Sequence, residues 1–283
     1  WSVYAVPVDE HGLNGSTSSA TMLMDDHRPS IQAFLNTTTN ENVSSSSLFV
    51  DASEIIDLDN DTVAIYPNYL KDGIPITLLS YQFLPARYST DGQTVYDLSG
   101  NNYHARLGDP VTNDFREPTY AEGIIGGAYS FDGSNDYMIT PLNIDQSSSS
   151  KGVTFEVWVK PASTSSDWHQ VLTTDSGSWN WGIARHSSKW YVLRGGSYWE
   201  TPYYVDVNEW QHLVAEFIPG TGVRFYKNGV GSVHGAIDYS TNDGNVTLGR
   251  RTDGYYYFDG VIAEARVYDY IVTPDQIKTN YNG

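Results

Sequence analysis

The stretch that decides the fold reads Tyr129-Ser-Phe-Asp-Gly-Ser-Asn-Asp-Tyr137. Its Asp-Gly and Asn-Asp steps favour a tight turn, because glycine tolerates positive φ and the short polar side chains bond to the local backbone. It is followed by Val153-Thr-Phe-Glu-Val-Trp-Val-Lys-Pro161, in which valine or phenylalanine occupies every second position. This period of two predicts a β-strand. Trp158 lies on the opposite face from these residues, so we expect both faces of the strand to be partly covered.

Similar short runs recur along the chain and are separated by Gly, Asn, Asp and Ser, at intervals typical of β-sandwiches. Helix signals are scarce. Thr273-Pro-Asp-Gln276 offers an N-cap with proline at the first helical position, before Ile277 and Tyr281. The sequence therefore predicts a nearly all-β protein with one short helix near its end.

Four further segments extend the pattern: Glu209-Trp-Gln-His-Leu-Val214, Val223-Arg-Phe-Tyr-Lys-Asn-Gly229, Val246-Thr-Leu-Gly249 and Gly260-Val-Ile-Ala-Glu-Ala-Arg-Val-Tyr268. In order and spacing, these segments together with the first two resemble the laminin G-like (concanavalin A-like) jelly-roll family. The resemblance covers roughly residues 81–283. It implies a two-sheet antiparallel sandwich whose usual work is binding carbohydrate or protein outside the cell.

The beginning of the chain has a different composition. The first 80 residues hold 6 aromatic residues against 33 in the rest, and 11 acidic residues against Arg28 and Lys71 alone. Because a single core seldom grows beyond about 250 residues, we expect two domains: a small β-rich domain over 1–78 and the jelly roll over 79–283. No family resemblance covers residues 1–78. Its first strand candidate is Trp1 to Val8.

The composition of the chain argues against several classes of partner and site. The formal net charge of -18 argues against a nucleic-acid partner, since phosphate binding depends on clustered Lys and Arg. The sequence contains no cysteine, so disulfides and thiolate metal sites are excluded. The sequence has no apolar run of about 18 residues, and we therefore expect no membrane span.

An extracellular, secreted location is expected on two grounds. The sequence begins at Trp1 rather than Met, which suggests a removed leader or a truncated longer protein. It also carries five Asn-X-Ser/Thr sequons, which are candidate glycosylation sites. The asparagines are Asn14, Asn36, Asn42, Asn60 and Asn245. The alternative is a chance excess of sequons in a region rich in Ser and Thr.

Family members often hold a structural calcium near the segments that correspond to Asp97-Leu-Ser-Gly-Asn-Asn-Tyr-His104 and to residues 131–137. Calcium needs six to eight oxygen ligands, gathered here from loops. The resemblance implies candidate calcium ligands at Asp97, Asn101, Asp132, Asp136 and Glu264. Ala263 stands where the family commonly has a carboxylate, which puts the site in doubt. The alternative is that these are turn and surface residues.

Aromatic residues crowd between positions 179 and 210. Flat rings stack on the apolar faces of sugars while carboxylates and amides bond the hydroxyls, which makes this the best region for a ligand. Four tryptophans, Trp179, Trp181, Trp190 and Trp210, are expected in the core. Tyr198, Trp199 and Tyr203, flanked by Gly195 and Pro202, are predicted to lie in an exposed loop and are our candidate ligand-binding residues. The alternative is a loop that folds over its own sandwich edge.

Catalysis is disfavoured. A retaining glucanase needs two carboxylates about 5 Å apart, usually on one strand. Here Glu156 stands alone, and Glu264 has Ile262 and Arg266 at the alternate positions. A lyase could use tyrosine and histidine, but His169, His186 and His212 match no known arrangement. We therefore predict that the protein is not an enzyme.

The prediction is an extracellular, non-catalytic binding or adhesion protein that recognises glycan or a protein partner. The alternative is a structural subunit of a filament, surface layer or virion with the jelly roll displayed outward. In that version the strand Trp1 to Val8 completes a neighbour's sheet by β-augmentation. A polysaccharide-active enzyme is a second, disfavoured alternative.

Overall fold

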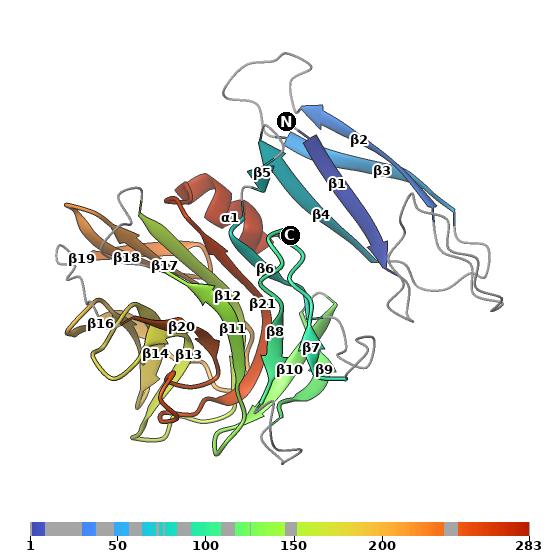
Figure 1. Ribbon diagram of the computed structural model, residues 1–283. Coiled ribbons are helices and arrows are strands. Elements are labelled where there is room, and N and C mark those ends of the chain that lie inside the picture. The colour runs from blue at the N-terminus through green and yellow to red at the C-terminus, as the bar shows by residue number, and fades with distance from the viewer. Residues whose placement is uncertain are drawn as a thin grey trace. The chain divides into compact units, whose positions relative to one another are not determined.

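A computed structural model describes the chain in segments. These are residues 2–8, 30–37, 48–56, 64–71, 74–75, 77–83, 92–108, 117–124, 126–144, 152–234 and 243–282, with the backbone alone for those up to 75 and for positions 234 and 243. The chain divides into two compact units, Trp1–Ile76 and Thr77–Gly283 (Figure 1). The candidate site lies in the second unit.

The first unit contains two small antiparallel sheets. One has the order β1-β4-β5, with β1 at Ser2–Val8, β4 at Ala64–Lys71 and β5 at Ile74–Pro75; the other pairs β2 (Ser30–Thr37) with β3 (Leu48–Ile56). β1 pairs with β4 along its whole length. The predicted first strand is therefore present and has a partner in its own chain, while Trp1 lies outside the described residues. Assembly through this strand stays a prediction.

The second unit is built on two antiparallel sheets. Sheet I has the order β19-β18-β17-β12-β21-β10-β9, and β6 also pairs with β21. Its strands are β6 (Leu79–Tyr81), β9 (Thr119–Glu122), β10 (Gly127–Asp132), β12 (Val153–Pro161), β17 (Gln211–Ile218), β18 (Gly222–Lys227), β19 (Val230–His234) and β21 (Asp259–Tyr268). The predicted all-β antiparallel sandwich is confirmed.

Sheet II has the order β16-β15-β14-β13-β20-β11-β8-β7. Its strands are β7 (Thr94–Val95), β8 (Ala105–Leu107), β11 (Met138–Asn143), β13 (Trp168–Asp175), β14 (Gly182–His186), β15 (Lys189–Leu193), β16 (Tyr198–Tyr204) and β20 (Asp243–Leu248). Because β13 to β16 follow one another along the chain, three successive hairpins build one end of this sheet.

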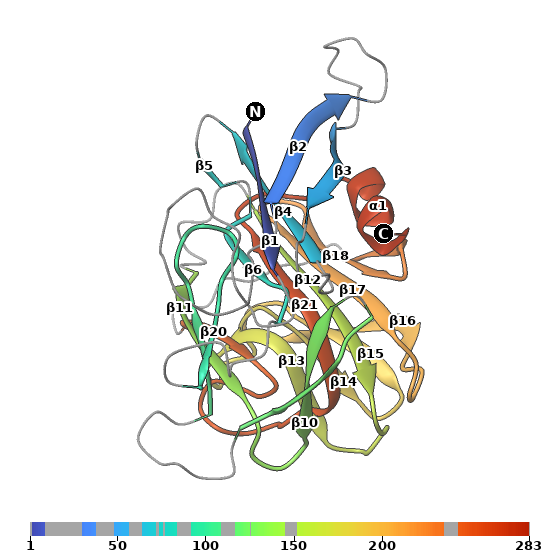
Figure 2. The ribbon, with the colours of Figure 1, turned by 90° about the vertical axis from the view of Figure 1, so that its right-hand side faces the viewer.

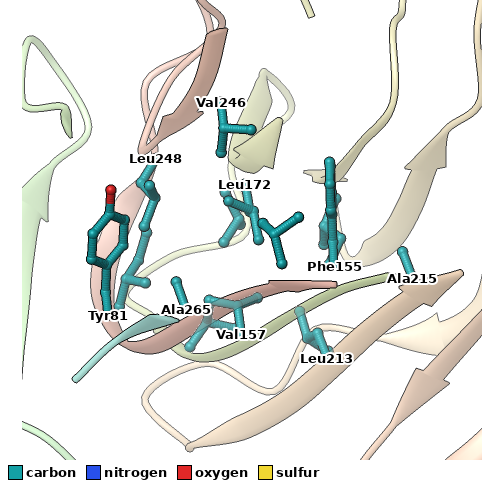
Figure 3. Packing of buried hydrophobic residues seen from close by; sticks show 14 of the residues in the cluster. Tyr81, Phe155, Val157, Leu172, Leu213, Ala215, Val246, Leu248 and Ala265 are labelled. Atoms are coloured by element: carbon teal, nitrogen blue, oxygen red, sulfur yellow. The ribbon is translucent and has the colours of Figure 1, made fainter. Parts of the chain in front are cut away.

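The main core fills the space between the two sheets. Phe155 and Val157 of β12 point toward Leu172 and Val246 of the opposite sheet (Figure 3). Trp181 stacks flat on Phe217, with ring centroids 4.7 Å apart and an interplanar angle of 4°. Fully burying one such side chain stabilises the fold by roughly 1.5–3 kcal/mol. The expected core positions of Trp181 and Trp190 are confirmed, since both are fully buried.

The helix α1 (Pro274–Asn282) covers part of the outer face of sheet I (Figure 2). Thr273 caps it, as the sequence predicts, by accepting a 3.2 Å bond from the backbone N–H of Gln276 to its Oγ1. Ile277 is buried beneath it, and Tyr281 stacks on Trp158 with centroids 5.7 Å apart. This contact helps to explain why residues on both faces of β12 are buried.

A buried polar network lies between α1 and sheet I. The carboxylate of Glu156 accepts hydrogen bonds from His212 Nε2 at 2.8 Å, Tyr268 Oη at 2.6 Å and Asn280 Nδ2 at 3.0 Å. Burial alone would raise the pKa of Glu156, but the His212 hydrogen bond and the charge of Arg266 lower it to about 2. Glu156 is thus a structural carboxylate whose oxygens are used inside the protein.

Candidate ligand-binding site

An aromatic cluster covers the outer face of sheet II at the β13–β16 end. It consists of Trp168, Trp179, His186, Tyr191, Tyr198 and Tyr256. Trp168 lies at its centre, 4.8 Å from both Trp179 and His186 and 4.9 Å from both Tyr191 and Tyr198. Trp168 points outward because Ile183 and Val192 of the neighbouring strands occupy the inward positions. The cluster is therefore separate from the main core.

One buried carboxylate organises the turn that carries Trp179. Asp175 Oδ1 accepts hydrogen bonds from the backbone N–H groups of Gly177, Ser178 and Asn180 at 2.9, 3.0 and 3.2 Å. Its Oδ2 accepts a 2.7 Å bond from Gln170 Nε2. A side chain that bonds forward to the backbone is what makes Asp a turn residue. The turn is thereby held in one shape.

Backbone bonds join this turn to the two neighbouring loops. The N–H of Gly195, between β15 and β16, donates to the carbonyl of Trp179 at 2.9 Å, and the N–H of Gly196 donates to Ser178 at 2.9 Å. The N–H of Thr252, in the loop after β20, donates to the carbonyl of Asp175 at 2.9 Å. The turn that carries Trp179, the loop that leads into Tyr198 and the loop that carries Tyr256 are therefore fixed to one another.

A cavity of about 490 Å³ opens beside the cluster. Its described lining residues are Gly133, Ser166, Asp167, Trp168, His169, His186, Tyr256 and Tyr257. They come from the β10–β11 turn, the loop before β13, the start of β13, the end of β14 and the loop before β21. The cavity shares Trp168, His186 and Tyr256 with the cluster and falls within the size range of small-ligand pockets.

Some polar groups of the cavity are already used inside the protein. His169 Nδ1 donates to the carbonyl of Tyr257, and its Nε2 accepts from Ser165 Oγ at 2.6 Å. Burial, and then the charge of Arg185, lower the pKa of His169, so this imidazole is neutral near neutral pH. Tyr191, in the cluster, donates to Glu200 Oε2 at 2.5 Å. These groups orient the site.

Other polar groups of the cavity make no hydrogen bond to the described part of the protein. They are the carboxylate of Asp167, the hydroxyl of Ser166, the imidazole of His186 and the hydroxyl of Tyr256. Each can therefore bond to a ligand without breaking an existing contact. Together with the face of Trp168, they make a site with both apolar and polar recognition elements.

Residues 132–278 match the family model for the concanavalin A-like lectin/glucanases superfamily. The chain belongs to this superfamily. The suspected family and the fold expected from it are thus confirmed. The search of curated protein sequences found no match to the chain.

Solved structures share the concanavalin A-like fold. Domain 4 of an extracellular arabinanase from Geobacillus stearothermophilus, solved with arabinotriose, is 21% identical; the match covers 72% of this chain and 97% of that domain, with a TM-score of 0.53. The binding domain of botulinum neurotoxin serotype D is 16% identical over 73% of this chain and 51% of that domain, with a TM-score of 0.52. A Trypanosoma rangeli sialidase mutant is 13% identical over 73% of this chain and 32% of its own length, with a TM-score of 0.52.

Within this concanavalin A-like sandwich, the candidate ligand residues lie on strand β16 rather than in the predicted loop. The loop prediction was wrong because alternation in Tyr198–Tyr204 is hidden by aromatic residues on both faces. Tyr198 points outward, is 46% exposed and belongs to the cluster, whereas Trp199 and Tyr203 pack against the main core. The structure therefore brings one of the three residues to the candidate site.

Trp179 and Trp210 also differ from expectation. Trp179 was expected in the core on the same face as Trp181, but it lies in the turn at φ +55° and is half-buried in the cluster. The turn breaks the alternation on which that expectation depended. Trp210 is half-buried on the outer side of sheet I. Sequence reasoning missed Trp168, Asp167 and Tyr256; the run Tyr255-Tyr-Tyr257 in a loop was the available signal.

The implied calcium ligands are mostly engaged by the protein. The carboxylate of Asp97 accepts from the backbone N–H groups of Ser80, Ser99 and Tyr103, each at 2.9 Å. Asn101 Nδ2 donates to the carbonyl of Leu78 at 2.9 Å. These oxygens and amides hold the loop after β7 together. Oxygens that already accept N–H bonds have less capacity to bind a cation.

The other three implied ligands form two groups. Asp132 Oδ1 accepts from the N–H groups of Ser134 and Asn135, and Asp136 Oδ2 accepts from the N–H of Asp132 at 2.9 Å. Glu264 binds Arg266 at 3.0 Å on β21. Within the described residues no group of three or more His, Asp or Glu side chains suits a metal ion. Calcium binding stays a prediction, with the Asp132–Asp136 pair as the place to test it.

The sequons are placed as follows. Asn14, Asn42 and Asn60 lie outside the described residues, and Asn36 lies on β2. Asn245 is half-exposed on β20, where its Oδ1 is 3.5 Å from Asn143 Nδ2. Glycosylation stays a prediction. No helix in the described ranges is long and apolar enough to cross a membrane.

Proposed function

We propose that this protein is a non-catalytic binding module that recognises glycan outside the cell. The observation that carries the proposal is the cavity of about 490 Å³ in which Trp168 and Tyr256 stand beside the free polar groups of Asp167, Ser166 and His186. Aromatic faces stack on the apolar side of a sugar ring while such groups bond its hydroxyls. The solved arabinanase domain with arabinotriose gives support from a protein of the same fold.

The number of carboxylates among the described lining residues of the cavity favours binding without turnover. Glycoside hydrolysis uses two carboxyl groups that flank the scissile bond. Asp167 is the single carboxylate among the described lining residues. Glu156, a carboxylate on the central strand β12, is held in the network beneath α1. We therefore propose a role in recognition rather than cleavage.

The test uses the full chain on an array of oligosaccharides, followed by calorimetric titration of the best binder. Removing one stacking ring should weaken binding about tenfold or more. The variants are Trp168→Ala and Tyr256→Ala, and Trp210→Ala is the control because it removes a half-buried indole from the other sheet. The proposal fails if no glycan binds, or if Trp210→Ala weakens binding as much as both cavity variants.

Two variants are needed because Trp168 contacts four other rings and its loss could disturb the cluster. Tyr256 contacts one ring of the cluster, Trp179 at 6.0 Å, and the guanidinium of Arg251 at 4.6 Å, so fewer rings repack when it is removed. Circular dichroism of each variant separates a folding defect from a binding defect. A folded Tyr256→Ala protein that binds glycan as well as the unchanged chain would place the ligand elsewhere.

A further inference from the structure

The charged side chain that a ligand in the cavity can reach is an aspartate. Asp167 is exposed, lines the cavity and has no hydrogen bond or ion pair within the described residues. No lysine or arginine is among the described lining residues. A ligand that enters the cavity therefore meets one full charge, and that charge is negative.

The nearby cations are engaged by other residues of the protein. Arg185 is fully buried, and its guanidinium bonds to Ser163 Oγ at 3.0 Å and to the carbonyl of Ser165 at 3.5 Å. Arg251 forms a two-bond pair with Asp253 at 2.6 and 2.8 Å.

Arg250, in the same loop, covers the ring of Tyr137 at 3.4 Å. None of these three side chains lines the cavity. Arg251 and Arg250 do contact lining residues: Arg251 stacks 4.6 Å from the ring centroid of Tyr256, and Arg250 Nη1 donates to Tyr257 Oη at 3.4 Å. Both guanidinium groups are thus engaged by the protein, and no lysine or arginine among the described lining residues offers a direct partner for a carboxylate or sulfate.

We propose that the cavity selects uncharged, hydroxyl-rich glycans and rejects acidic ones; this rests on the proposed function. The Asp167 carboxylate can accept hydrogen bonds from two sugar hydroxyls, and bonds to a charged acceptor are stronger than neutral ones. The same carboxylate repels a uronate, sialate or sulfate group, and the net charge of -18 adds a repulsive field. Attraction and exclusion thus come from one side chain.

The test compares matched pairs of probes that differ in charge. Galacturonate oligosaccharides and their methyl esters share one backbone, and lactose and sialyllactose differ by one acidic sugar. The full chain should bind the uncharged member of a recognised pair about tenfold or more tightly at low salt. The ratio should shrink as salt rises from about 20 to 500 mM, because screening weakens the repulsion.

Asp167→Asn is the decisive variant, because Asp167 makes no hydrogen bond or ion pair in the described protein and acts on Arg185 and His169 only through its charge. It should weaken binding of the uncharged probe about tenfold and bring the ratio of the pair closer to one. Asp269→Asn is the matched control. It changes the net charge equally. Asp259, at the start of β21, lies beside Gly133 of the cavity, whereas Asp269 follows the other end of that strand.

The outcomes separate this inference from the function beneath it. If the acidic member of a pair binds as tightly as the uncharged one, the inference is overturned and glycan binding stands. If the uncharged member is preferred but Asp167→Asn leaves the ratio unchanged, Asp167 is not the selecting group. If no glycan on the array binds, the proposed function itself fails.

Discussion

The indole rings of Trp168 and Trp179 lie 4.8 Å apart, although Trp168 begins strand β13 and Trp179 follows its far end. A strand of this length spans over 20 Å, at about 3.3 Å per residue, so the turn after β13 must fold back over the outer face of sheet II. Asp175 holds the turn there by accepting three backbone hydrogen bonds.

Asp175→Ala should therefore disorder the cluster as well as destabilise the fold. Three backbone N–H groups lose their acceptor, and we expect a loss of about 2–3 kcal/mol in the free energy of unfolding. The near-ultraviolet circular dichroism of the tryptophans should fall in the folded protein. Asp253→Ala, which removes an exposed ion pair with Arg251, is the control and should cost under about 1 kcal/mol. Equal effects of the two variants would contradict the role given to Asp175.

Glu156→Gln should destabilise the protein in a pH-dependent way. The pKa of Glu156 is lowered to about 2 in the fold, so its stabilisation is present above the unfolded pKa near 4.5 and is lost as pH falls toward 2. We expect a loss of roughly 1–3 kcal/mol at pH 7 and a smaller one at pH 3, measured by urea unfolding. Glu209→Gln, on the exposed approach to β17, should change little at either pH.

Asp136→Asn should act in the opposite direction. Burial and the nearby charge of Asp132 raise the pKa of Asp136 to about 6. A raised pKa favours the protonated form in the fold, so stability present below about pH 4 is lost as pH rises through 6. Replacing the acid by a neutral amide should gain about 1 kcal/mol or more at pH 7.5 and nothing at pH 4.

The same pair gives the test for calcium. An ion bound beside Asp132 and Asp136 would offset their repulsion and raise the melting temperature of the unchanged protein at pH 7.5. Asp136→Asn should then lose that response. A melting temperature that is the same with calcium and with chelator would remove the prediction that this pair binds the ion.

Gly249→Ala should be among the most damaging single-methyl additions. Gly249 has φ +81°, and a Cβ there would lie 2.3 Å from Cδ1 of the buried Phe131. We expect a loss of about 3 kcal/mol or more, from backbone strain together with overpacking. Gly220→Ala tests strain alone, since its φ is +69° with no heavy atom within 4 Å, and should cost about 1 kcal/mol. Thermal unfolding of both variants separates the two contributions.

The sandwich could be predicted from sequence because its strands follow period-two patterns. Val153, Phe155, Val157 and Val159 lie on the inner face as the alternation requires. Thr273 caps α1 as its spacing indicates. These features depend on neighbours within a few residues along the chain. The family resemblance added the order of the segments.

The candidate site could be predicted only in part because its parts are distant in sequence. Tyr256 reaches Trp179 through a loop after β20, and Asp167 reaches His186 across a hairpin. Alternation assigned Trp179 to the core, since no local pattern reveals a turn that folds back. Trp199 and Tyr203 were misplaced because aromatic residues occur on both faces of β16.

The bonds that fix the three loops of the cluster run between main-chain groups or from Asp175 to main-chain groups. The ring-bearing side chains of Trp179, Tyr198 and Tyr256 are not members of those bonds. Exchanging a ring for another side chain therefore leaves the loop frame intact. Substitutions at these three positions can therefore change what the proposed site binds, one position at a time, while the main-chain frame of the loops is kept.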